Sequence, residues 1–448
     1  MEYSPLETLG YLFYAVNPNR TTYVKVEEVP NYIIEVVPWF ITFLVVERFF
    51  LLLKKKPMRV NDFLGSASQG LMTEISRLVL DGWKFAAYIY IYSHWRIVTL
   101  PWDSLWTWFI ALIAADFLYY WTHRASHEIN LIWAAHQVHH SSEDYTLSTA
   151  LRQSVLLSQL LWILYLPVAL IVPPAPFLVH FQLNFIYQFW LHTELIKSIG
   201  PLEYILNTAS HHRVHHGRNR YCIDKNYAGF LIIWDRMFGT FEAEKEQVVY
   251  GTVSSINTFE PLYIQFGDTV NLLKKAWSAN GLRYKLSTIF KGPGWSPGKP
   301  WLGDTADIPE IQFPVKKYDP YLPFWCILYS IGHFALVPLV YIELQKYQHF
   351  IPPMVLYGAV AYLIFTLTSL GCFLEQRSYA PWLESLRCLL YVVLDYYFIS
   401  CPMFSILKFE HHMIFLKIIR GLFLVSGIIW LKIFIGNWTI KISSKKLK

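Results

Sequence analysis

The sequence predicts an all-α, polytopic integral membrane protein with about nine spanning helices and a histidine-box cap on the cytosolic side. Composition indicates the membrane class, because 54% of the 448 residues are hydrophobic and only 16% are charged, whereas soluble domains carry about 25% charged residues. The mean hydropathy of +0.31 also comes from apolar stretches along the whole chain. Clustered histidines between residues 123 and 216 predict where the chemistry lies.

Nine apolar stretches approach the length of about 20 residues that a helix needs to cross a bilayer. Two of them are separated only by Val172-Pro173-Pro174, so we expect a tight hairpin that enters the bilayer and returns. The nine candidate spans are residues 32–53, 83–99, 104–122, 155–172, 175–191, 322–343, 352–373, 385–405 and 413–436.

Cationic residues beside the first span predict the orientation of the chain. Lys54, Lys55, Lys56 and Arg59 directly follow it, which favours a cytosolic location for that end and a luminal N-terminus. Counting forward through nine spans places residues 123–154, residues 192–320 and the C-terminus in the cytosol.

The last four residues provide a separate indication of location. They read Lys445-Lys446-Leu447-Lys448, a pattern typical of the dilysine signal that coat proteins recognise on the cytosolic side of endoplasmic-reticulum membrane proteins. The alternative is a solvated basic end. Because the topology count also places this end in the cytosol, we expect a multi-pass protein of the endoplasmic-reticulum membrane whose active site faces the cytosol.

Three regions follow from this pattern. We expect a luminal tail and membrane helices in residues 1–104, a catalytic domain with a cytosolic cap in residues 105–320, and C-terminal membrane helices with the basic tail in residues 321–448. The net charge of +6 indicates contact with lipid headgroups and no nucleic-acid partner. The five cysteines show no paired spacing, so neither a disulfide framework nor a thiolate metal site is expected.

The chain has 16 histidines, and 11 of them fall between His123 and His216. They form one H-x-x-x-H box and two H-x-x-H-H boxes. Since residues three and four apart share a helix face, each box is expected to direct two or three imidazoles at one point. So many imidazoles beside a membrane are costly unless they share partners, which favours a metal site. The boxes comprise His123, His127, His136, His139, His140, His212, His215 and His216.

The other histidines are expected to be structural, with one exception. His192 follows the returning hairpin and faces the same surface as the boxes, so either a ninth ligand or a structural role is open to it. His211 is adjacent to a box histidine and should point to another face. The histidines expected to form only structural hydrogen bonds are His94, His180, His333, His349, His411 and His412.

The number of nitrogen donors favours two metal ions. Zinc takes about four protein ligands, or three in catalytic sites, so a single zinc would leave several of these imidazoles unused. Imidazole is compatible with zinc, copper, iron and nickel, so the residue types do not select the metal.

The boxes and their neighbours resemble the fatty acid hydroxylase and sterol desaturase superfamily of membrane di-iron enzymes. The resemblance covers roughly residues 105–245 and includes six stretches: ADFLYYWTH at 115–123, HHSSEDY at 139–145, HTEL at 192–195, NTASHHRVHHG at 207–217, NYAG at 226–229 and WDRMFGTF at 234–241. It implies iron as the metal, with two ions held by the eight box histidines and with His192 as a ninth ligand.

Within the superfamily, the chain resembles the tetrahydrobiopterin-dependent members that cleave ether lipids. The likeness rests on His127-Glu128 in the first box and on an extra hydrophobic region at about 322–437. It implies hydroxylation, with O₂, of the ether-linked carbon of 1-alkyl-glycerols and lyso-alkyl lipids; the hemiacetal then collapses to a fatty aldehyde and glycerol. It also implies that Glu128 is required for activity, either by orienting an imidazole or by binding the pterin.

Two alternatives remain at this point. A sterol or fatty-acyl hydroxylase or desaturase that uses cytochrome b5 would have the same boxes but would lack the C-terminal spans. A histidine-lined metal transporter would place ionisable residues within the membrane, often between repeated halves. Here the boxes fall at span ends and no internal repeat is visible.

Overall fold

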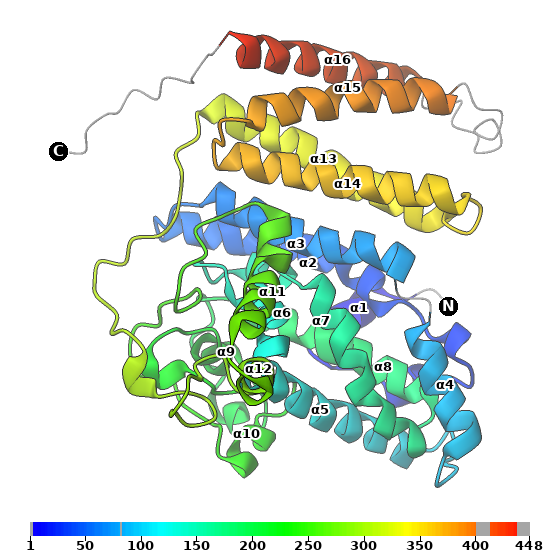
Figure 1. Ribbon diagram of the computed structural model, residues 1–448. Helices are drawn as coiled ribbons and strands as arrows, with labels where there is room; N and C mark the ends of the chain where they lie inside the picture. The colour runs from blue at the N-terminus through cyan, green and yellow to red at the C-terminus, as the bar shows by residue number, and fades with distance from the viewer. Residues whose placement is uncertain (1–2, 81–82, 400–412, 437–448) are drawn as a thin grey trace. The chain divides into compact units, whose positions relative to one another are not determined.

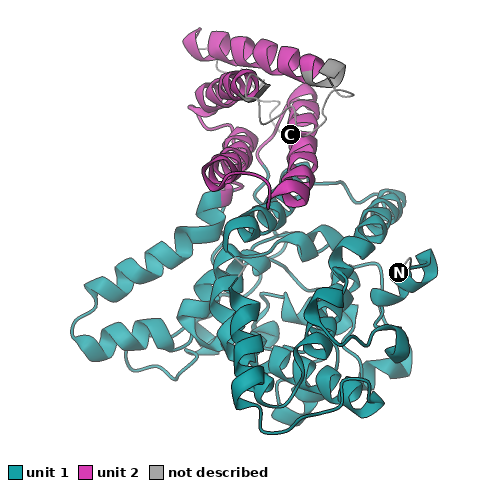
Figure 2. Cartoon of the chain, turned by 90° about the vertical axis from the view of Figure 1, so that its right-hand side faces the viewer, with its two compact units in different colours: residues 1–258, 262–319 teal, residues 259–261, 320–448 magenta. Residues whose placement is uncertain are grey.

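The computed structural model describes residues 3–80, 83–399 and 413–436, and over these residues the fold is all-α, as predicted (Figure 1). The chain forms two compact units (Figure 2). Unit 1 comprises residues 1–258 and 262–319, and unit 2 comprises residues 259–261 and 320–448. Within the described residues, extended pairing is limited to two isolated bridges, Leu206 with Leu231 and Gly217 with Tyr250.

Unit 1 contains the helices that carry the histidine boxes. Their bounds are α1 Pro5–Tyr11, α2 Tyr32–Leu53, α3 Val60–Leu80, α4 Lys84–Trp95, α5 Leu105–Glu128, α6 Asn130–His140, α7 Val155–Leu161, α8 Pro174–Tyr187, α9 Ala209–His215, α10 Ile233–Phe238, α11 Pro261–Ser278 and α12 Leu282–Phe290. The 3₁₀ segments η3 Leu147–Leu151, η4 Trp162–Leu170 and η5 Gln188–Leu191 connect several of them.

A single extended residue separates α5 from α6. Ile129 has φ −121° and ψ 115°, so α5 ends at Glu128 and a new helix begins at Asn130. The two helices pack against each other. This break therefore folds the second histidine box back onto the first.

The core of unit 1 joins α1, α2, α5 and α8. Apolar residues of α8, including Val179, Leu183 and Tyr187, recur at spacings of four and pack with Tyr14 and Trp108. The spacing places them on one face of α8. This core holds α5 and α8 together, and both of these helices lead directly into histidines of the site.

Four helices are long and apolar enough to cross a membrane: Val26–Leu53, Phe324–Tyr347, Pro353–Leu374 and Lys417–Ile435. They match the first, sixth, seventh and ninth predicted spans, and they support the membrane class. The predicted span 83–99 is a 12-residue helix, α4, which rises only about 18 Å, whereas the hydrocarbon core is about 30 Å thick. It ends because Arg96 leaves the helical conformation.

The predicted hairpin at 155–191 is also less regular than expected. Residues 155–170 form a seven-residue α-helix followed by a 3₁₀ segment that contains Pro167, and α8 begins at Pro174 with 14 residues. Apolar composition alone did not reveal these breaks. Nine spans are therefore not established by the described structure.

Unit 2 consists of α13 Phe324–Tyr347, α14 Pro353–Leu374, α15 Ala380–Ile399 and α16 Met413–Ile435. A fully buried ion pair, Glu384 with Arg387, lies among these helices. Tyr329 Oη and Ser369 Oγ each donate to the Glu384 carboxylate at 2.7 Å, so the buried charges are satisfied. The predicted dilysine tail and the predicted structural residues His411 and His412 lie outside the described residues.

Candidate metal centre

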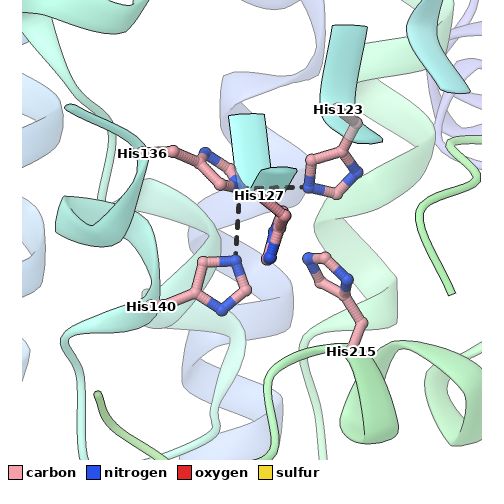
Figure 3. A group of neighbouring side chains, drawn as sticks. All are labelled: His123, His127, His136, His140 and His215. Carbon is pink, nitrogen blue, oxygen red and sulfur yellow. Dashed lines mark hydrogen bonds between the residues drawn. The ribbon is translucent and has the colours of Figure 1, made fainter. Parts of the chain in front are cut away.

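All nine predicted ligands are buried in unit 1, where they form two groups. In each group, one nitrogen from every ring lies within 4.8 Å of the nitrogens of the others. Figure 3 shows the rings of the larger group pointing toward a common centre. Centre A comprises His123, His127, His136, His140 and His215, and centre B comprises His139, His192, His212 and His216.

The two H-x-x-H-H boxes are divided between the centres, and this corrects the expectation that each box serves one point. In α6, His136 and His140 belong to centre A and His139 to centre B. In α9 and its C-cap the assignment is reversed: His212 and His216 belong to centre B, while His215 belongs to centre A. Residues at i and i+4 point about 40° apart, whereas the i+3 residue points about 100° from its i+4 neighbour. Each box therefore bridges both centres.

Backbone carbonyls fix the protonation of four of these rings. The Nδ1 atoms of His123, His139, His192 and His215 lie 2.7–2.9 Å from carbonyl oxygens of Tyr227, Arg152, Gln188 and Lys225, respectively. A carbonyl oxygen only accepts hydrogen bonds, so each Nδ1 must carry the proton. In the neutral ring, Nε2 then presents a lone pair.

In centre B, these lone pairs face one another. His192 Nε2 lies 3.2 Å from His139 Nε2, 3.1 Å from His212 Nε2 and 3.2 Å from His216 Nε2. Because both His139 and His192 have their proton on Nδ1, no hydrogen is available between their Nε2 atoms. Two nitrogens each about 2.1 Å from a shared ion, at angles of 90–109°, would lie roughly 3.0–3.4 Å apart. The spacing therefore fits a metal ion and not a hydrogen bond.

Centre A shows the same character. His136 Nε2 lies 3.1 Å from His123 Nε2 and 3.2 Å from His140 Nε2. His127 Nε2 and His215 Nε2 are buried and have no hydrogen-bond partner among the residues that the structure describes. Buried polar atoms are rarely left unsatisfied, so these nitrogens are suited to a cation in the middle of the group.

Electrostatics keep these imidazoles in the form that binds metal. Burial is the largest cause that lowers the pKa of all nine rings, followed in most of them by charge repulsion from neighbouring histidines. The pKa of His139 falls to about 4. The rings are therefore neutral at physiological pH, and neutral imidazole is the metal ligand.

One short loop contacts three of the five rings of centre A. The carbonyls of Lys225 and Tyr227 accept from His215 and His123, and an Asp224 carboxylate oxygen lies 3.8 Å from His127 Nδ1. Asp224 has φ +58°, a left-handed conformation that aspartate tolerates better than most residues. Metal-binding histidines are commonly oriented in this way by carbonyls and carboxylates.

Centre B is supported from the end of the candidate span α2. The buried carboxylate of Glu47 accepts from Thr193 Oγ1 and from the backbone N–H of Leu147. Arg213 donates to the carbonyl oxygens of Thr193 and Ile196 at 3.0 and 2.7 Å. These contacts hold the segment after His192. Through Glu47 they connect centre B with the candidate span α2.

Glu128 does not contact an imidazole directly. Its Oε1 accepts from Arg124 Nε at 2.8 Å, and Asp224 occupies the place beside His127. Burial, followed by the charge of Glu128, raises the pKa of Asp224 to about 7. The role of Glu128 in activity stays a prediction.

Sequence reasoning did not identify Asp224 or Glu47 as residues that support the site. Glu47 carried a usable signal, because a carboxylate within a candidate span marks a functional position by default. Asp224 carried none, since it follows the third box by eight residues in an irregular loop.

The remaining histidines are placed apart from the two centres. His180 Nδ1 lies 2.9 Å from Tyr14 Oη, and His94 Nδ1 bonds to the carbonyl of Tyr90. His333 receives a hydrogen bond from Arg387. His211 lies against the ring of Phe241 and outside both centres, as its position in the sequence indicated.

Comparisons with known proteins agree with this geometry. A family model for fatty acid hydroxylases matches residues 108–240, and one described as the C-terminal domain of alkylglycerol monooxygenase matches residues 326–413. The chain is 47% identical to alkylglycerol monooxygenase of Xenopus tropicalis, over 88% of this chain and 89% of that protein. It is 48% identical to the Homo sapiens protein over 86% of each, and 36% identical to that of Caenorhabditis elegans over 91% and 83%. No solved structure matches the chain.

Proposed function

The chain belongs to the alkylglycerol monooxygenase family and is thus a membrane oxidoreductase. On this premise we propose that its nine clustered histidines would hold two iron ions, and that the enzyme hydroxylates 1-alkyl-glycerols with tetrahydrobiopterin as reductant. The observation that carries the proposal is the pair of buried centres with five and four imidazoles. Two separate sets of convergent nitrogens suit two ions. The lone pairs that face each other in centre B support a cation between them.

The expected reaction places oxygen on the carbon next to the ether oxygen. When bound, the two irons and the pterin supply the oxidising chemistry that the side chains themselves lack. The product is a hemiacetal, which breaks down to a fatty aldehyde and glycerol without further help from the protein. The same chemistry would apply to lyso-alkyl lipids.

Unit 1 positions the ligand imidazoles and keeps water away from both centres. Carbonyls of Tyr227, Arg152, Gln188 and Lys225 set the tautomers of four ligands, so that Nε2 atoms face the centres. Both centres are buried, which excludes bulk water from the reacting oxygen. Glu47 connects centre B to α2, only six residues before that helix ends at Leu53. Because this is the end of a candidate span, the alkyl chain of a lipid can stay in the membrane while its polar head reaches centre B.

We also propose that the protein lies in the endoplasmic-reticulum membrane with its active site facing the cytosol. Support comes from the lysines after α2 and from the C-terminal Lys445-Lys446-Leu447-Lys448 sequence, which coat proteins would recognise. The nine-span topology belongs to the same proposal. Its best additional candidates are residues 105–122 of α5 and the 20 residues of α15, which rise about 27 and 30 Å, whereas α4 and the irregular segments up to α8 would have to cross as shorter elements. Replacing the tail lysines by serine should move the protein out of the endoplasmic reticulum.

The reductant is tested by turnover of purified protein. We expect fatty aldehyde to form from an alkylglycerol with tetrahydrobiopterin and not with cytochrome b5 and NADH. The reverse result would favour the sterol or fatty-acyl alternative. His139→Ala and His215→Ala, one from each centre, should abolish turnover while the protein stays in the membrane, and full activity of either variant would contradict the two-metal site.

A further inference from the structure

The helices α11 and α12 follow each other across a short turn and form a hairpin (Figure 1). The side chains on its outer surface are unusual for a polar cap. Its inner face belongs to unit 1: Ile264, Leu272 and Ala276 of α11 are buried, and their positions share one side of the helix. A second apolar stripe runs along a different side. Val270, Leu273 and Trp277, at spacings of three and four, are 45%, 50% and 83% exposed.

The second helix continues this exposed apolar surface. Leu282, Leu286 and Phe290 follow at spacings of four, and their exposed fractions are 71%, 46% and 50%. On a water-covered cap, so large a set of exposed apolar side chains would be costly, and such sets usually mark a contact with another apolar surface. One apolar face of the hairpin therefore packs within unit 1, and the second, exposed face is suited to contact a different apolar surface.

The charges beside this surface are almost all positive. Between residues 261 and 298 the only carboxylate is Asp268, whereas there are five cations, a balance of +4. Lys285 lies 5.1 Å from the ring of Trp277, a pairing of tryptophan and lysine typical of membrane interfaces. The five cations are Lys274, Lys275, Arg283, Lys285 and Lys291.

We propose that α11 and α12 lie on an anionic lipid surface, with this apolar face inserted at the level of the headgroups. Amphipathic helices that carry lysine and arginine beside aromatic and aliphatic residues bind lipid in this way. The unit that carries the hairpin already has a candidate span, Val26–Leu53, so a bilayer is within reach. A second copy of the chain fits less well, because two faces of the same positive sign would repel each other.

This docking would bring the membrane surface next to the metal-binding helix. Asn130, the first residue of α6, donates two hydrogen bonds to the end of α12: its backbone N–H donates to Lys291 O at 2.8 Å and its side-chain amide to Thr288 O at 3.0 Å. Helix α6 carries His136, His139 and His140. A lipid headgroup beneath the hairpin would then lie about one helix diameter, roughly 10 Å, from α6.

Spin labels on the full-length protein in vesicles test the proposal. Labels at Leu273→Cys and Leu282→Cys should be accessible to O₂ and protected from a water-soluble nickel complex, at a depth of roughly 5–10 Å into the boundary between headgroups and acyl chains. The matched control is Asn271→Cys, which is exposed on the other side of α11 and should show the opposite preference. Wild-type protein gives the labelling background, since the cysteines that the structure describes are buried.

The lipid dependence separates the charge contribution from simple apolar contact. With phosphatidylserine in the phosphatidylcholine vesicles, both labels should lie deeper, and Lys274→Gln with Arg283→Gln should remove that increase. Equal exposure of Leu273→Cys and Asn271→Cys to nickel would overturn the proposal. Protection of the labels from both O₂ and nickel, together with magnetic coupling between labels on different chains, would also overturn it, because that result would indicate contact with a second copy of the chain. Unchanged metal content in all variants shows that the fold is intact, and because no reaction is measured, failure here would leave the proposed function standing.

Discussion

Acid should unfold the metal-free cap far more easily than the metal-loaded one. The nine clustered imidazoles are neutral in the folded protein because burial lowers the pKa of each, whereas in an unfolded chain the pKa is about 6.5. Below pH 6.5 the unfolded state therefore binds more protons than the folded state. Stability is complete above pH 6.5 and falls as the pH decreases toward about 4, the folded pKa of His139.

The size of the effect follows from the number of groups. At pH 5.5, one unit below the unfolded pKa, each neutral imidazole lowers the free energy of unfolding by about 1.4 kcal/mol. For the nine rings of the two centres the total is on the order of 10 kcal/mol, comparable with the whole stability of an ordinary domain. Bound metal occupies the same nitrogens and should delay the loss to lower pH.

Thermal melting in detergent micelles, followed by circular dichroism at pH 7.5 and 5.5 with and without a chelator, measures this difference. His136→Ala should reduce the pH dependence by about one proton, or about 1.4 kcal/mol per pH unit. His94→Ala is the control, since His94 is exposed and lies outside both centres. An equal melting temperature of the metal-free protein at the two pH values would refute the reasoning.

Three substitutions test individual residues of the site. His192→Ala removes one of the four nitrogens of centre B, so elemental analysis should find close to one iron per chain, and two would exclude His192 as a ligand. Asp224→Asn keeps the side-chain shape but removes the charge beside His127. Competition with a chelator should show that metal binds about 10–100-fold more weakly. Unchanged affinity would mean that Asp224 does not support the site. Glu128→Gln breaks an ion pair with Arg124 on the helix surface, which contributes only about 0.3–0.5 kcal/mol. The melting temperature should therefore hardly change, while turnover should fall. Full turnover would exclude a role of Glu128 in the reaction.

Local periodicity predicted which histidines share a helix face, but not which of them meet at one centre. Spacings of three and four within a helix are fixed by backbone geometry, so the boxes in α5, α6 and α9 required no tertiary information. His192 could be placed from its position just after the returning segment at 175–191. The structure brings all nine together.

The division of the boxes into two centres depends on tertiary structure. Helices α6 and α9 each present their i and i+4 histidines to one centre and the i+3 histidine to the other, and only the mutual placement of the helices decides which centre receives which. The loop that contains Asp224 and Lys225 is irregular, so no spacing predicted its contacts with His127 and His215. The segment at 84–95 had the apolar composition of a span without its length, since the chain leaves the helical conformation at Arg96.

The metal content of the purified wild-type protein tests the central claim most directly. Elemental analysis of full-length protein, expressed with iron available and kept in detergent, counts the ions per chain and identifies them. Two irons per chain are expected, falling to about one in His127→Ala of centre A and in His216→Ala of centre B. A single ion, or zinc in place of iron in fully active protein, would contradict the assignment.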